Sequence, residues 1–207
     1  MKMLLTTIVL FVLIILTTSL ARAQWYIGGA LIQAESDQGL GFDTPPNTET
    51  DDSTDIAWKL LAGYDFSSTF AFEFGYSDLG DEYTTFNIFG NNEKTVMDVS
   101  AIYATLIGRT KVYNQVDFFG RLGLAFWNVD IDYTEPGFNS SGSDNDLDLI
   151  VGFGFAWRLN EVLGVRFEWE QFQNVGDEVK TNLPSGNRLE LNGQDINVLA
   201  IGLTYSF

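Results

Sequence analysis

The pattern of apolar and polar side chains has a period of two from residue 24 onward. In residues 147–159, bulky apolar side chains occupy nearly every second position, and small or polar ones lie between them. Residues 70–77 and 199–207 repeat this alternation. Because successive side chains of a strand point to opposite faces, the pattern predicts strands with one bulky apolar face.

Eight segments of the chain show the alternation, and clusters of Gly, Asn, Asp and Ser separate them. These segments are residues 25–34, 55–66, 70–78, 95–108, 116–129, 146–159, 162–173 and 193–207. Three connections between them are short, around residues 67–68, 111–114 and 160–161. Four are long, near residues 35–54, 79–94, 130–145 and 174–192. No linker interrupts the series, so one antiparallel domain is predicted.

The two faces of the predicted strands indicate what surrounds them. The face opposite the bulky side chains is rich in glycine and carries few charges, which suits the crowded interior of a narrow barrel. The aromatic and aliphatic face then requires an apolar solvent. Apolar-out strands with short turns at one end and long loops at the other are typical of transmembrane barrels. The sequence therefore predicts an all-β fold, an eight-stranded antiparallel transmembrane β-barrel. A soluble exported barrel with an aromatic core is the alternative.

Aromatic side chains near the predicted strand ends agree with this fold, because girdles of aromatic residues mark both interfaces of a membrane barrel. On the short-turn side the expected girdle residues are Trp25, Tyr64, Phe66, Phe70, Phe118, Trp157 and Phe207. Toward the long loops they are Tyr76, Trp127 and Phe172.

The first 23 residues have the features of an export signal. Lys2 precedes an apolar run of 13 residues at 4–16, and Ala21-Arg22-Ala23 supplies small residues for cleavage before Gln24. The run is short for a spanning helix, which needs about 20 apolar residues. We expect a cleaved signal peptide (1–23), export by the Sec pathway and a mature barrel domain (24–207). A retained membrane anchor is the alternative.

Composition excludes several classes of function. The chain has no cysteine and no histidine, which rules out disulfides, thiolate nucleophiles, imidazole metal ligands and a Ser-His-Asp triad. Its 28 acidic and 11 basic residues give a net charge of −17, which opposes binding to nucleic acid. No cofactor is expected.

Several short motifs resemble the transmembrane domain of the outer-membrane protein A family. In chain order, the stretches similar to the family's first, third, fifth, seventh and last strands are 25–30, 72–80, 121–123, 166–169 and 202–207. Phe207 corresponds to the terminal aromatic residue that the family presents to the outer-membrane assembly machinery. The peptidoglycan-binding domain of longer members is missing, so the resemblance implies no tethering role.

Alternation places six charged side chains in the predicted lumen: Lys59, Glu73, Arg121, Arg166, Glu168 and Glu170. The strands of Glu73 and Arg166 face each other across an eight-stranded barrel, and the two side chains lie at similar depth. In the family the matching Glu and Arg form a gating salt bridge, so the resemblance implies such a gate here. Leu106 and Ala156 occupy the positions expected for a second family pair, which is therefore not carried over.

A polar plug that fixes the barrel is the other interpretation of these charges, since breaking a buried ion pair costs about 3–5 kcal/mol. Acid–base catalysis by Glu168 and Glu170 is disfavoured, because the neighbouring basic groups would keep both carboxylates ionised. The narrow lumen has no room for a polymeric substrate either. No enzymatic activity is expected, and eight strands leave no open channel for a general porin.

The predicted long loops hold most of the negative charge. Residues 35–54 contain six acidic residues and no basic one, whereas Arg109, Lys111 and Arg158 lie on the short-turn side. This asymmetry favours long loops outside the cell and short turns in the periplasm. Two acidic spacings are weak calcium candidates, although both lack the glycine and terminal glutamate of an EF-hand. They consist of Asp130, Asp132 and Glu135, and of Asp144, Asp146 and Asp148.

These features predict a monomeric outer-membrane protein of a Gram-negative cell, with a role in envelope integrity and surface interaction. Its expected partners are outer-membrane lipid, lipopolysaccharide, the assembly machinery and an extracellular ligand. A small gated pore or conduit for hydrophobic compounds, controlled by Glu73 and Arg166, is the second hypothesis. A soluble periplasmic binding barrel is the third.

Overall fold

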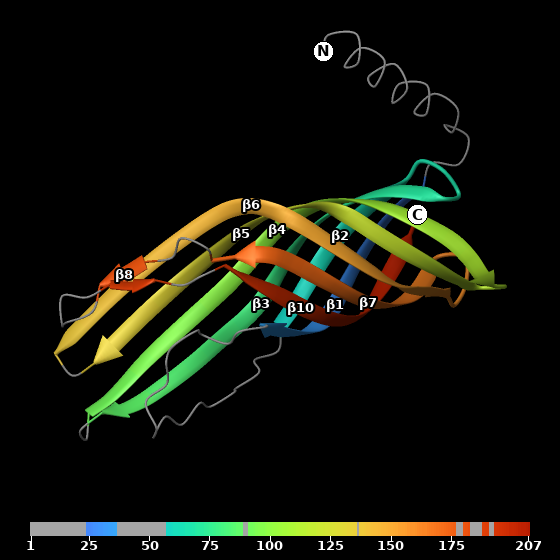
Figure 1. The fold of residues 1–207 in the computed structure, drawn as a ribbon. Coiled ribbons are helices and arrows are strands. Elements are labelled where there is room, and N and C mark those ends of the chain that lie inside the picture. The colour runs from blue at the N-terminus through green and yellow to red at the C-terminus, as the bar shows by residue number, and fades with distance from the viewer. Residues whose placement is uncertain are drawn as a thin grey trace, which may run out of the picture.

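Eight strands close into an antiparallel barrel in the order β1-β10-β7-β6-β5-β4-β3-β2 (Figure 1). The computed structural model describes residues 24–36, 57–88, 91–135, 137–176, 180–182, 188–190 and 193–207. The barrel strands are β1 (Gln24–Ser36), β2 (Ala57–Asp65), β3 (Phe70–Ile88), β4 (Asn91–Tyr113), β5 (Val116–Glu135), β6 (Phe138–Arg158), β7 (Leu163–Val175) and β10 (Gln194–Ser206). The predicted strand number and antiparallel order are confirmed.

A small second sheet pairs β8 (Lys180–Asn182) with β9 (Arg188–Glu190), in the connection between β7 and β10. The predicted signal peptide, residues 1–23, and nearly all of the predicted loop 35–54 lie outside the described residues. Within the described ranges, no helix is long and apolar enough to cross a membrane.

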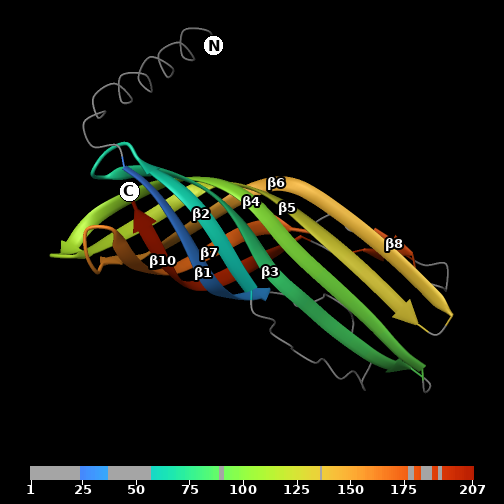
Figure 2. The same ribbon diagram turned by 180° about the vertical axis from the view of Figure 1, so that it is seen from behind.

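The barrel closes between its first and last strands, and the backbone N–H of Phe207 donates to the carbonyl of Trp25 at 3.0 Å. Both ends of the barrel domain therefore lie beside the three short turns (Figure 2). The side chain of Ser67 accepts backbone hydrogen bonds from Thr69 and Phe70, and that of Asn160 caps the β6–β7 turn in the same way. Such side-chain caps explain why Ser and Asn mark the predicted short connections.

Two of the predicted long loops are in fact strands. The β3–β4 pairing continues to Ile88 opposite Asn91, and the β5–β6 pairing continues to Glu135 opposite Phe138. The predictions of loops at 79–94 and 130–145 are therefore wrong. Outward side chains of the β5–β6 extension, such as Asp130, Asp132 and Ser141, are polar, so this extension lacks the bulky outward face that marks the predicted strands. Strands β3 to β6 consequently run past the rest of the barrel as a projecting sheet (Figure 1).

The outward face of the barrel carries a belt of exposed apolar side chains on all eight strands, such as Leu31, Phe74, Leu122 and Phe155. On the side of the projecting sheet, the belt ends at a ring of polar outward residues. This ring consists of Gln33, Asp78, Ser100, Asn128, Asn145, Gln171 and Asn197. A smooth apolar belt with a polar border is the surface that a bilayer requires.

The predicted girdle on the long-loop side needs correction. Tyr76 is outward and exposed, and its ring lies 5.5 Å from that of Trp58. Trp127 and Phe172, however, are 0% and 1% exposed and lie inside the barrel. Each is separated from the outward residues of its own strand by an odd number of positions, and because side chains alternate along a strand, it points inward. Trp169 is the outward aromatic residue of β7 at this level.

Candidate functional site

The inward face of the barrel holds the six predicted charges in one layer. Strand β7 contributes Arg166, Glu168 and Glu170 at alternate positions, and β2, β3 and β5 contribute Lys59, Glu73 and Arg121. All six are at most 5% exposed. Their burial shows that all six side chains point into the lumen, as the alternation of side chains along each strand predicts. We call these six residues the charged layer.

Glu73 and Arg166 meet across the lumen as predicted, and the guanidinium donates to the carboxylate of Glu73. Arg121 is the centre of the layer. Its Nη2 lies 2.7 Å from Glu73 and 2.7 Å from Glu168, and its Nη1 contacts Glu170. One arginine thus joins β5 to both β3 and β7, so the Glu73–Arg166 pair is part of a larger network.

Lys59, on β2, completes the network. Its ammonium lies 3.0 Å from Glu168 and 2.9 Å from Glu170, and the side chain is fully buried. Three cations face three carboxylates, so the layer is neutral (3 − 3 = 0). Burying charges without a partner would cost several kcal/mol per ion, and this balance avoids that cost.

Aromatic side chains that the sequence analysis did not single out complete the charged layer. The hydroxyl of Tyr26 donates to Glu73 at 2.6 Å, and the guanidinium of Arg166 lies 4.5 Å from the ring centre of Phe119. Each ring covers a glycine on the paired strand: a Cβ on Gly63 would lie 2.1 Å from the Tyr26 ring, and one on Gly154 would lie 2.7 Å from Phe119. The inward glycines therefore make room for these rings.

Of the two positions assigned to the second family pair, the structure places only Ala156 in the lumen. It is paired with Arg166 and has the same inward direction. Leu106 is 49% exposed on the outer face, so its assignment to the lumen was wrong by one residue. The inward neighbours on β4 are Thr105 and Ile107, which are 1% exposed and carry no charge.

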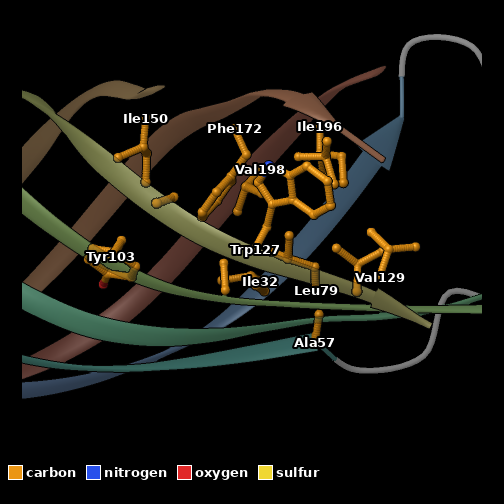
Figure 3. Close-up of a cluster of buried hydrophobic side chains, with 14 of the residues drawn as sticks. Ile32, Ala57, Leu79, Tyr103, Trp127, Val129, Ile150, Phe172, Ile196 and Val198 are labelled. Atoms are coloured by element: carbon orange, nitrogen blue, oxygen red, sulfur yellow. The ribbon is translucent and has the colours of Figure 1, made fainter. Parts of the chain in front are cut away.

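Beyond the charged layer, toward the projecting sheet, the lumen is filled with apolar side chains (Figure 3). Each of the eight barrel strands contributes to this cluster. We define the apolar layer by one residue from each strand: Ile32, Ala57, Leu79, Tyr103, Trp127, Ile150, Phe172 and Val198. This apolar layer departs from the expectation that the inward face is small or polar throughout.

On the short-turn side, a cavity of about 140 Å³ leads from the turn residues up to Arg166. We call this cavity the vestibule. Two ion pairs flank it: Arg109 lies 2.9 Å from Asp65, and Arg158 lies 3.1 Å from Asp117. The charged layer therefore faces a polar entrance on one side and the apolar layer on the other.

The calcium candidates lie on strands rather than in loops. Asp130 and Asp132 are on the outward face of β5, whereas Asp144, Asp146 and Asp148 share the opposite face with Trp127, whose indole donates to Asp148 at 2.8 Å. The side chain of Glu135 is outside the described residues. Among the described side chains, no group of three or more acidic residues is arranged to hold a metal ion.

The outward acids of the projecting sheet form a row across three strands. Asp98 on β4 is paired with Asp81 on β3 and with Asp130 on β5. Partial burial, and then the charges of Asp81 and Asp78, raise the pKa of Asp98 above its ordinary value. This row lies beyond the polar border of the apolar belt, so the protein presents a concentrated negative charge there.

Residues 20–207 match a protein family described as the OmpA-like transmembrane domain. Outer membrane protein A of Klebsiella pneumoniae is 23% identical over 189 residues, which cover 88% of this chain and 51% of that protein. Outer membrane protein A of Klebsiella aerogenes is 22% identical over 185 residues, covering 88% of this chain and 48% of that protein. The chain spans about half the length of these relatives.

Solved structures of outer-membrane barrels have the same fold. The outer membrane protein AlkL, determined by solid-state NMR, has a TM-score of 0.60 at 12% identity, with 90% of each chain covered. A major outer membrane protein of Thermus thermophilus has a TM-score of 0.56 at 12% identity, covering 89% of this chain and 99% of that one. Neisserial surface protein A has a TM-score of 0.54 at 14% identity, covering 89% and 97%.

Proposed function

Because the chain belongs to the family of OmpA-like transmembrane domains, we propose that it is a closed barrel that reinforces the outer membrane and displays an acidic surface outside the cell. The protein is an integral β-barrel of the bacterial outer membrane, and its family is not enzymatic. The observation that carries the proposal is the filled lumen, in which the neutral charged layer and the apolar layer lie in series. Because the lumen is filled, the protein interacts with other molecules through its outer surfaces.

The distribution of charge supports the orientation of the barrel. The acidic row of Asp81, Asp98 and Asp130 lies on the projecting sheet, and Arg109 and Arg158 lie at the short-turn end. The projecting sheet then faces the exterior, beside the lipopolysaccharide head groups, and both termini face the periplasm. In this arrangement Phe207, which is 65% exposed, is available to the assembly machinery. We expect a monomer, because the closed barrel leaves no free sheet edge for pairing with a second copy.

The test is a deletion strain of the source bacterium. Loss of the protein is expected to raise detergent sensitivity and vesicle release, and the wild-type gene restores both. A variant with Asp98→Asn, Asp130→Asn and Asp132→Asn is expected to restore integrity while making the cell surface measurably less negative in electrophoretic mobility. A deletion without effect on sensitivity or vesicle release would contradict the reinforcing role.

A small gated pore, or a conduit for hydrophobic compounds, is the second candidate. The vestibule favours it, because this cavity brings solvent from the short-turn side to the Glu73–Arg166 pair. Planar-bilayer recordings of the wild type, Glu73→Ala and Arg166→Ala test this role. Arg109→Ala is the matched control, since Arg109 is also paired with a carboxylate but lies outside the charged layer. Openings whose frequency changes only in the first two variants would support a gate, and silence in all of them would exclude it.

A further inference from the structure

We propose that the barrier to permeation through this barrel is the apolar layer, centred on Trp127, and not the Glu73–Arg166 pair. This inference rests on the proposed function, in which the lumen is closed, and it assigns the closure to particular residues. It follows from three observations: the order of residues along the strands, the completeness of the apolar layer, and the way in which Trp127 is held.

The order of inward residues puts the two layers in series. Along β7, from the short turn outward, Arg166, Glu168 and Glu170 are followed by Phe172. Any solute that passes the charged layer from the vestibule therefore meets the apolar layer next. Opening the ion pairs alone leaves that second obstacle in place.

The apolar layer is continuous around the barrel wall. Every barrel strand contributes to it, and Trp127, Ile150 and Val198 are 0% exposed while Phe172 and Tyr103 are 1% exposed. Figure 3 shows Trp127 of β5 beside Phe172 and Val198, which come from the neighbouring strands β7 and β10, and all three side chains lie inside the barrel. An ion in this region would lose most of its hydration among apolar side chains, which is costly, and the carboxylate of Asp148 at its edge is already engaged by the Trp127 indole.

Trp127 is the largest of the fully buried side chains, and a hydrogen bond fixes its direction. Its indole Nε1 donates to the carboxylate of Asp148 on the paired strand at 2.8 Å. The bond attaches the ring to β6 and keeps it inside the lumen. Asp148 is therefore a positioning residue for the barrier, which gives this acid a role that the calcium hypothesis did not consider.

Single cysteines can test the inference directly, because the chain has none of its own. Ala156→Cys places a thiol in the vestibule, and Val198→Cys places one in the apolar layer. The probe is a cationic, membrane-impermeant methanethiosulfonate added to barrels refolded in lipid vesicles. Heat-dependent electrophoretic mobility shows that each variant is folded. Ala156→Cys is expected to react at least about tenfold faster than Val198→Cys, because the second thiol reacts only after local opening.

Second substitutions in the Val198→Cys background then separate the two layers. Trp127→Ala is expected to raise the reaction rate at least about tenfold, whereas Trp127→Phe, which keeps the layer filled, and Arg166→Ala leave it nearly unchanged. Asp148→Leu is expected to raise the rate more than Asp148→Asn, which still accepts the indole hydrogen bond. If Trp127→Ala does not fold, this Asp148 pair and Arg166→Ala still test the proposal.

Three results would overturn the proposal. Rapid reaction of Val198→Cys alone would mean that the layer is hydrated. A rate increase with Arg166→Ala as large as that with Trp127→Ala would place the barrier in the charged layer. An unchanged rate in folded Trp127→Ala would remove Trp127 from the barrier. None of these results depends on the deletion phenotype, so they are distinct from failure of the reinforcing role.

Discussion

Removing one cation from the charged layer should destabilise the barrel far more than breaking an ion pair at its mouth. Lys59→Met leaves two guanidinium groups against three carboxylates, a buried net charge of 2 − 3 = −1. The lost contacts, at 3.0 Å and 2.9 Å, involve side chains that are at most 1% exposed. At an effective dielectric constant of about 20, each contact corresponds to about 5 kcal/mol, and part of this is offset because the variant avoids the cost of removing an ammonium from water. The net loss of unfolding free energy should be about 3–5 kcal/mol.

Urea unfolding in lipid vesicles, followed by tryptophan fluorescence and heat-dependent mobility, measures this loss. The control is Arg109→Met, which breaks a pair whose side chains are 24% and 20% exposed and should cost no more than about 1 kcal/mol. Adding Glu170→Gln to Lys59→Met restores neutrality and should recover most of the stability, because neutral replacements of buried pairs are well tolerated. Equal costs for Lys59→Met and Arg109→Met, or a double variant as unstable as the sum of its parts, would refute the reasoning.

Three further predictions concern other parts of the barrel. Gly123→Val should abolish the heat-shifted folded form, since a Cβ there would lie 2.0 Å from the carbonyl oxygen of Ala104, and a normal folded band would contradict this. The raised pKa of Asp98 means that this residue binds protons more readily in the folded than in the unfolded protein. Its contribution to stability therefore falls as the pH rises from the ordinary pKa of an aspartate through the pKa in the folded protein. Asp98→Asn should therefore stabilise the barrel at neutral pH and lose this advantage below about pH 4, whereas a gain that persists in acid would rule out the ionisation as its cause. Phe207→Ala should lower assembly into the outer membrane in cells but leave refolding into vesicles unchanged, and equal losses in both assays would indicate a purely structural role for this residue.

The positions of the lumen charges could be predicted because their strands alternate strongly. In residues 70–77, aromatic outward positions leave Glu73 no direction but inward, and the same holds for Arg166 beside Phe167. Distances across the lumen could not be predicted, because they depend on barrel shear and side-chain reach. The central role of Arg121, with contacts to three carboxylates, emerged only from the structure.

The errors on aromatic residues arose from assigning them by strand end rather than by face. Phe126 and Trp127 are neighbours on β5, and only Phe126 has the parity of the outward residues Leu122 and Leu124. Alternation alone would thus have placed Trp127 inside. The length of the projecting strands was missed for a different reason. In residues 129–133, the apolar side chains alternate with Asp130 and Asp132 but point inward, the reverse of the bulky outward face that marks the predicted strands.

The most direct test of the central claim is solute efflux from proteoliposomes that contain the folded wild-type barrel. With the charged and apolar layers closing the lumen, a small sugar should leave these vesicles no faster than it leaves protein-free vesicles. A 16-stranded porin reconstituted in parallel provides the positive control. Efflux from the wild-type barrel at a rate that approaches the porin's would contradict a closed lumen.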